Sequence, residues 1–99
     1  LLRLCRHIQQ SLAHPWELEQ AASYINVSGR TLSRRFQRET GLRFGDWVRR
    51  ARLLAALNAL AAGHSVLEVA LDLGYDSPSA FSAMFRRQLG VAPSTYFAK

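Results

Sequence analysis

The chain repeats itself after 49 residues, and this repeat limits the possible folds more than any other feature of the sequence. Aligned with itself at that offset, the sequence places Ser28 on Ser77, Phe36 on Phe85 and Gly41 on Gly90. Further matching pairs are Leu18 with Leu67, Glu19 with Glu68, Ala21 with Ala70, Ser33 with Ser82, Arg38 with Arg87 and, in character, Leu32 with Phe81 and Trp47 with Tyr96. Such a repeat predicts two copies of one supersecondary unit.

Apolar residues recur with a helical period along the whole chain, which predicts an all-α fold of about seven helices. The first helix follows an apolar stripe from Leu1 to Leu12. It ends before Pro15, because proline disfavours helical angles at the residue that precedes it. The remaining helices are predicted over residues 16–24, 29–40, 44–62, 65–74, 78–89 and 93–97.

Each copy of the repeat has the same order: a helix, a short turn, a second helix with a serine N-cap, and a glycine stop. Two helices joined by so short a turn form a helix-turn-helix unit. Ser65 and Glu68 have the spacing of a capping box at the start of the second copy. We therefore expect a homeodomain-like arrangement: residues 1–43 as a first helix-turn-helix subdomain, 44–62 as a long linking helix, and 63–99 as a second subdomain.

The basic residues are almost all arginine. Twelve of the thirteen are Arg, only Lys99 is Lys, and the net charge is +6. The planar guanidinium group suits phosphate and the edge of guanine, so the composition favours a nucleic-acid partner. An Arg-rich surface that reflects only genome composition, or one that lies on a membrane, stays open at this point.

Metal, cofactor and membrane-spanning functions find little support in the sequence. Cys5 is the only cysteine and has no partner for a disulfide or a zinc site, and the histidines lack metal-ligand spacing. No apolar stretch is long enough to span a bilayer. We expect no metal, no cofactor, no membrane and a cytoplasmic location. No arrangement of nucleophile and base is indicated either, so we expect a protein that is not an enzyme.

The predicted helix 29–40 presents arginines on the side opposite its buried face. At about 100° per residue, Leu32 and Phe36 define the buried face, and Arg30 and Arg34 lie near the opposite side. Residues in the N-terminal half of a recognition helix reach the bases of the major groove. We therefore predict that Arg30 and Arg34 contact bases, and that the DNA backbone is contacted by Ser28, Thr31, Arg35, Arg38 and Arg43. A merely solvated face is the alternative, above all for Arg38.

The predicted helix 78–89 differs at the equivalent positions. It carries Ser79 where the first copy has Arg30, and Ala83 where the first copy has Arg34. We expect Ser79 and Ala83 to face the bases and to recognise shape or a thymine methyl group, or the helix to hold the DNA backbone, with Ser77, Ser82 and Arg86 as backbone contacts. The linking helix of about 28 Å is near the ~34 Å that separates adjacent major-groove segments, so we expect it to place both recognition helices on one face of the duplex. Because the two units are unequal, we expect an asymmetric site.

Gly74-Tyr75-Asp76-Ser77 is followed, at a characteristic spacing, by Phe81, Phe85, Gly90, Pro93 and Tyr96. Within residues 18–97, this pattern resembles the DNA-binding domain of the AraC/XylS transcription regulators. The resemblance implies seven helices, two helix-turn-helix subdomains on one long helix, and double-stranded DNA as partner. It also places Arg30 and Arg34 among the major-groove contacts. Ala83 departs from the pattern, since family members often carry a long polar side chain there.

The same resemblance implies contact with RNA polymerase and a separate effector-binding or dimerising domain, which is not visible in this sequence. We therefore expect a monomeric domain whose parent protein dimerises elsewhere. The competing hypothesis is a basic helical module that docks an acidic protein partner or RNA polymerase. Such a module would bind any polyanion with a strong salt dependence and little sequence preference. RNA binding is a weaker alternative, because no exposed aromatic platform is predicted.

Overall fold

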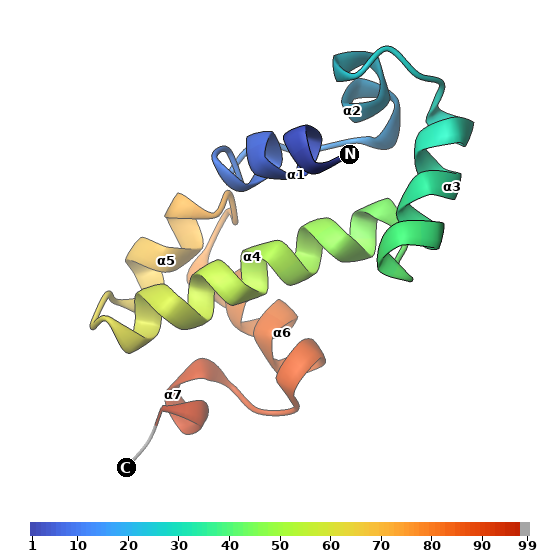
Figure 1. Ribbon diagram of the computed structural model, residues 1–99. Helices are drawn as coiled ribbons and strands as arrows, with labels where there is room; N and C mark the ends of the chain where they lie inside the picture. Colours follow the sequence, from blue (N-terminus) through green and yellow to red (C-terminus); the bar gives the residue numbers. More distant parts are fainter. Residues whose placement is uncertain (98–99) are drawn as a thin grey trace. The chain divides into compact units, whose positions relative to one another are not determined.

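Seven helices and no strands are present among residues 1–97, the part of the chain that the computed structural model describes (Figure 1). The all-α prediction is confirmed. The helices are α1 (Leu2–Gln9), α2 (Leu18–Tyr24), α3 (Gly29–Thr40), α4 (Phe44–Ala61), α5 (Val66–Asp72), α6 (Pro78–Leu89) and α7 (Pro93–Tyr96). The chain divides into a first unit, Leu1–Arg52, and a second unit that begins at Leu53, so that the division falls within α4.

The core of the first unit is built from two apolar residues on each of four helices. The buried side chains are Leu4, Ile8, Ala21, Ala22, Leu32, Phe36, Phe44 and Val48. Phe36 is fully buried, and its ring packs edge-on against Phe44 at 5.2 Å and Trp47 at 5.7 Å between centroids. Burying an aromatic ring of this size stabilises a fold by about 2–3 kcal/mol, so Phe36 anchors α3 against the start of α4.

Arg52 fixes the segment between α1 and α2. Its Nε donates a hydrogen bond to the carbonyl of Leu12 and its Nη2 donates one to the carbonyl of His14, each at 2.8 Å. Both carbonyls belong to residues that lie outside a helix and so have no helical partner. The planar fork of a guanidinium group can meet two carbonyls at once, which an ammonium group cannot do in the same geometry.

The second unit has its own core on α5 and α6. Its buried side chains include Val69, Ala70, Leu73, Phe81, Met84 and Phe85. The ring of Phe85 contacts Tyr96 of α7 edge-on at 5.6 Å, as Phe36 contacts Trp47 in the first unit. The aromatic pairs predicted to match at an offset of 49 therefore make matching contacts.

The second helices of the two units, α3 and α6, begin and end alike. The hydroxyl of Ser28 accepts a hydrogen bond from the Thr31 N–H at 3.1 Å, and that of Ser77 accepts one from the Ala80 N–H at 3.1 Å. Both helices end at a glycine in the left-handed region, Gly41 with φ of 74° and Gly90 with φ of 83°. The predicted caps and stops are confirmed.

The first helices of the two units, α2 and α5, match at an offset of 48, and the prediction that they share the offset of 49 is wrong. Each ends in the same pattern, with a residue at positive φ, Asn26 in the first unit and Gly74 in the second. The next N–H bonds back to the last turn, from Val27 to Ala22 and from Tyr75 to Ala70. Ala22 thus corresponds to Ala70, and the turn before Ser77 is one residue longer than the turn before Ser28.

Helix ends differ from the sequence prediction mainly around α1 and α2. The first helix stops at Gln9, and turns carry the chain on, so the apolar stripe continues past the helix through Leu12. α2 begins at Leu18 and not at Trp16, because Glu17 is extended and acts as its N-cap residue. The Trp16 indole N–H donates instead to the carbonyl of Ser11 at 2.8 Å.

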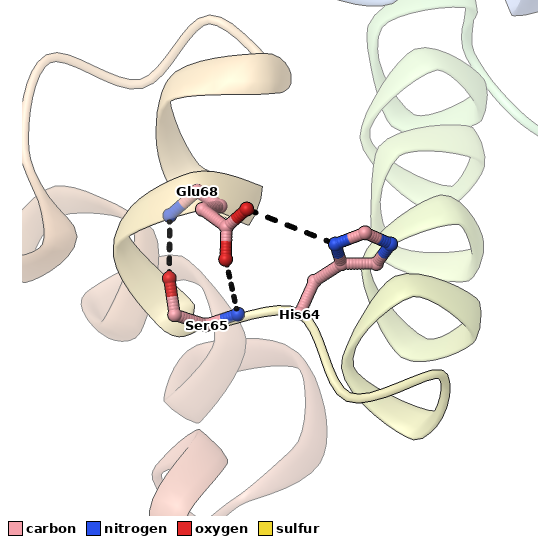
Figure 2. Close-up of polar contacts among 3 residues, drawn as sticks. All are labelled: His64, Ser65 and Glu68. Carbon is pink, nitrogen blue, oxygen red and sulfur yellow. Dashed lines mark hydrogen bonds and ion pairs between the residues drawn. The ribbon is translucent and has the colours of Figure 1, made fainter.

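The predicted capping box at the start of α5 is present (Figure 2). The Ser65 hydroxyl accepts from the Glu68 N–H at 3.1 Å, and the Glu68 carboxylate accepts from the Ser65 N–H at 3.1 Å. His64 Nδ1 lies 3.8 Å from the same carboxylate. The hydrogen bond from the Ser65 backbone, followed by the one from its side chain and by the charge of His64, lowers the pKa of Glu68.

Candidate nucleic-acid interface

The exposed face of α3 carries a stripe of arginines. Leu32 and Phe36 are fully buried, whereas Arg30, Arg34 and Arg38 are exposed. These three residues follow one another at intervals of four, so they lie along one side of the helix. None of them forms an ion pair within residues 1–97, so their charges are available to a partner.

A hollow of about 480 Å³ lies beside this stripe and is lined by Thr31, Arg34, Arg35 and Arg38. Arg35 is half-buried and the other two arginines are exposed. Three guanidinium groups around one surface hollow offer several charge-assisted hydrogen bonds to an oxyanion. The hollow is therefore chemically suited to a phosphate group.

The two hydroxyl groups at the start of α3 are hydrogen-bonded to each other. Ser28 accepts from the Thr31 backbone and donates its own hydroxyl hydrogen to Thr31 Oγ1 at 3.0 Å. The Thr31 hydroxyl hydrogen is left to donate elsewhere. Both hydroxyl residues are predicted to contact the DNA backbone, but only the Thr31 side chain has a hydroxyl hydrogen left to donate, while Ser28 holds the cap.

Not all the arginines of the first unit face solvent as free charges. Arg43 and Arg50 are exposed. Arg49 pairs with Asp46 one turn earlier in α4, and Arg52 binds the two loop carbonyls. Fewer arginines are therefore available to a partner between Ser28 and Arg52 than the sequence contains there.

On α6 the equivalent face carries short side chains. Ser79 and Ala83 are exposed, Ser77 and Ser82 are half-buried, and Arg86 is exposed in the last turn of the helix. The Ser77 hydroxyl is held by the cap to Ala80 but keeps its own hydrogen to donate. This face can make close contact with a surface, but it has no long side chain in its N-terminal half.

Arg87 is a further candidate for contact with the DNA backbone, which the sequence prediction omits. It is exposed, lies in the last turn of α6 and matches Arg38 at the offset of 49. The repeat indicates this residue, because Arg87 is the counterpart of Arg38, which is predicted to contact the backbone. The exposed positions of α6 that correspond to the arginine stripe of α3 are thus Ser79, Ala83 and Arg87.

The two units differ in charge as well as in their recognition faces. Residues 1–52 contain ten arginines against four acidic residues, whereas residues 53–99 contain three basic and three acidic residues. All of the net charge of +6 thus belongs to the first unit. A polyanion is attracted mainly to that unit.

Among the described residues, no helix is both long enough and apolar enough to cross a membrane.

Comparisons with known proteins agree with this geometry. A family model described as a helix-turn-helix domain matches residues 21–99. The transcriptional regulator NimR of Escherichia coli K12 is 43% identical over 82 residues, which are 83% of this chain and 30% of NimR. The regulatory protein SoxS of the same organism is 34% identical over 90 residues, covering 90% of this chain and 84% of SoxS.

The chain spans a limited part of several relatives: 30% of NimR, 34% of YpdC from E. coli and 24% of RipA from Corynebacterium glutamicum. Two solved structures resemble it over 96% of its length with a TM-score of 0.85. One is the DNA-binding domain of AdpA in complex with a target DNA, at 34% identity and 86% coverage of that chain. The other is the C-terminal domain of AraT from Geobacillus stearothermophilus, at 31% identity and 80% coverage.

The predicted family is thereby confirmed. The match begins within α2 and continues through both recognition helices, α3 and α6. It is supported by regulators of similar sequence and by the similar structure of the DNA-binding domain of AdpA. The chain belongs to the AraC-type helix-turn-helix family.

Proposed function

We propose that this chain binds double-stranded DNA in a sequence-specific manner as part of a transcription regulator, and acts by binding without a catalytic step. The observation that carries the proposal is the stripe of exposed, unpaired arginines on α3, which follows a short turn. The likeness to AdpA supports it, because that domain was crystallised with its target DNA.

In this proposal Arg30 and Arg34 contact base edges, since they lie in the N-terminal half of α3, where a recognition helix reaches the bases. An arginine that binds guanine O6 and N7 contributes about 1–3 kcal/mol of discrimination. Thr31, Arg35, Arg38 and Arg43 hold phosphates around them, and Thr31, Arg35 and Arg38 bind one phosphate group in the hollow that they line together with Arg34. The first unit supplies most of the affinity, because it holds the net charge.

The second unit contributes contacts of a different kind. Ser79 and Ala83 allow α6 to approach the groove closely, and a methyl side chain such as that of Ala83 suits contact with the thymine methyl. Ser77, Ser82 and Arg86 donate hydrogen bonds to phosphates, joined by Arg87. Because the two recognition faces are unequal, the DNA site is asymmetric even for one chain.

The domain is further proposed to act as a monomer in the bacterial cytoplasm and to offer RNA polymerase a surface away from the DNA. The exposed leucines of α5, Leu67 at 52% and Leu71 at 54% exposure, are suited to a protein partner. They lie outside the arginine stripe of α3 and outside the exposed face of α6.

The deciding experiment is selection from a random double-stranded library, followed by titration of the selected duplex and a scrambled duplex at two salt concentrations. We expect an asymmetric motif of about 15–20 base pairs with two blocks about one turn apart. We also expect the selected duplex to bind at least about 10³-fold more tightly than the scrambled one. Equal and equally salt-sensitive binding of both duplexes would contradict the proposal and leave a basic module for an acidic protein partner.

A further inference from the structure

A second hollow, of about 490 Å³, lies in the first unit on the side formed by α1, α2 and the segment between them. It is lined by His7, Ser11, His14, Trp16, Gln20, Ser23 and Tyr24. None of the residues assigned to DNA contact lines it. Its chemistry also differs from that of the hollow beside α3, because four of its seven lining side chains are aromatic rings and none is arginine.

The rings of this aromatic hollow are held in place by contacts with one another. His7 stacks on Tyr24 with centroids 4.3 Å apart and planes 6° from parallel. Trp16 meets His7 edge-on at 5.3 Å and His14 edge-on at 4.7 Å. The indole N–H of Trp16 is bound to the carbonyl of Ser11 at 2.8 Å, which fixes the orientation of that ring. A ligand would therefore meet ordered rings, and binding would order little besides the ligand itself.

Flat aromatic surfaces of this kind accept two sorts of guest, planar rings and organic cations. Charge decides between them. Among the described residues no carboxylate lines the hollow, and the unit that contains it holds ten arginines against four acidic residues. The surrounding field therefore opposes a cation and favours an anion. A planar ring with a negative or neutral substituent fits the hollow better than an ammonium group.

The polar groups of the hollow are suited to hydrogen-bond acceptors. The hydroxyls of Ser11 and Ser23 are exposed and can donate. The Gln20 side chain uses its Oε1 to bind Nε2 of His14 at 3.0 Å, which leaves its NH₂ group as a donor. We propose that this aromatic hollow binds a planar aromatic molecule of one or two rings that carries an acceptor group, with a carboxylate preferred to a cation.

The test uses three probes with one ring skeleton and different charges: nicotinate, nicotinamide and 1-methylnicotinamide. Each is titrated into the 99-residue chain labelled with ¹⁵N, and the indole N–H signals of Trp16 and Trp47 are followed by NMR. Molecules of this size bind weakly, so dissociation constants of about 1–10 mM are expected. We expect the Trp16 signal to shift and the Trp47 signal to stay, with nicotinate binding most tightly and 1-methylnicotinamide most weakly.

A pair of matched variants ties the binding to this site. Tyr24→Leu removes an exposed ring that lines the hollow, whereas Tyr96→Leu removes a similarly exposed ring in the second unit, the two tyrosines being 44% and 48% exposed. We expect Tyr24→Leu to weaken nicotinate binding about two- to tenfold and Tyr96→Leu to leave it unchanged. Nuclear Overhauser contacts between nicotinate and Trp16 in the unaltered chain give a readout that needs no variant.

Three results would overturn the proposal. The first is the absence of any Trp16 shift with all three probes up to about 20 mM, well above the expected dissociation constants. The second is equal weakening by Tyr24→Leu and Tyr96→Leu, and the third is tightest binding of 1-methylnicotinamide. DNA binding is measured separately, so failure here does not bear on the proposed function.

Discussion

Replacing Arg52 by alanine should destabilise the first unit strongly, although the residue belongs to no predicted site. The substitution removes two hydrogen bonds of 2.8 Å from a charged donor to the carbonyls of Leu12 and His14. A hydrogen bond from a charged group contributes about 1.5–3 kcal/mol. Both bonds are only partly buried, so water recovers some of the loss, and we expect a net cost of about 2–3 kcal/mol.

The assay is urea unfolding followed by tryptophan fluorescence. Both tryptophans, Trp16 and Trp47, belong to the first unit, so the signal reports the unfolding of that unit alone. For a unit this small, the slope of unfolding free energy against urea is about 1 kcal/mol/M, so the midpoint should fall by about 2 M or more. Arg52→Lys should recover at most one of the two hydrogen bonds and about half of the loss.

Arg50→Ala is the matched control. It removes the same charge from the same helix, but Arg50 is exposed and makes no hydrogen bond or ion pair among the described residues. We expect a change within about 0.5 kcal/mol. If Arg50→Ala and Arg52→Ala lower the midpoint equally, the effect comes from net charge, and the two carbonyl contacts of Arg52 do not account for it.

Three further predictions concern other parts of the chain. In fluorescence-anisotropy titrations, Arg34→Ala should lower the binding free energy by about 1–3 kcal/mol on the selected duplex and by much less on a scrambled one. Arg38→Ala should weaken binding to both duplexes alike. If Arg34→Ala weakens both duplexes equally, Arg34 does not contact bases. Asn26 has φ of 57°, a left-handed angle that valine adopts only with strain and glycine adopts freely. Asn26→Val should therefore lower the free energy of unfolding in urea by about 1–2 kcal/mol and Asn26→Gly should leave it unchanged; equal stabilities of the two variants would contradict this. The pKa of Glu68 is lowered in the folded state, so its stabilising effect is present above the ordinary carboxyl range and is lost as the pH falls through the lowered pKa. The midpoints of thermal unfolding of the parent chain and of Glu68→Ala should therefore converge between pH 7 and pH 3, and a constant difference between them would refute this.

The sequence was sufficient where structure depends on a few neighbouring residues. The caps at Ser28 and Ser77 and the stops at Gly41 and Gly90 were predicted because each depends on one side chain and the backbone beside it. The buried pair Leu32 and Phe36 followed from helical period alone. For the same reason the exposure of Arg30 and Arg34 could be predicted.

The sequence was insufficient where contacts join residues far apart or where a turn changes length. Nothing near Arg52 in the chain indicates that two carbonyls 38 and 40 residues away accept hydrogen bonds from its guanidinium group. The sequence predicts an offset of 49 for α2 and α5 as well, because Leu18 and Leu67 are both leucine and lie 49 residues apart. In the structure Leu67 is 52% exposed while Leu18 is half-buried, since the longer turn before Ser77 moves α5 by one position.

The equal construction of α3 and α6 has a consequence for how such a chain changes over time. Both helices have 12 residues, a serine cap and a glycine stop, and both hold their place through a buried phenylalanine. The stripe positions that differ most between them, Arg30 and Arg34 against Ser79 and Ala83, lie outside the core. The helix framework and the contact surface therefore depend on different residues. One recognition face can change while the other keeps its preference, and neither change needs compensation in the core.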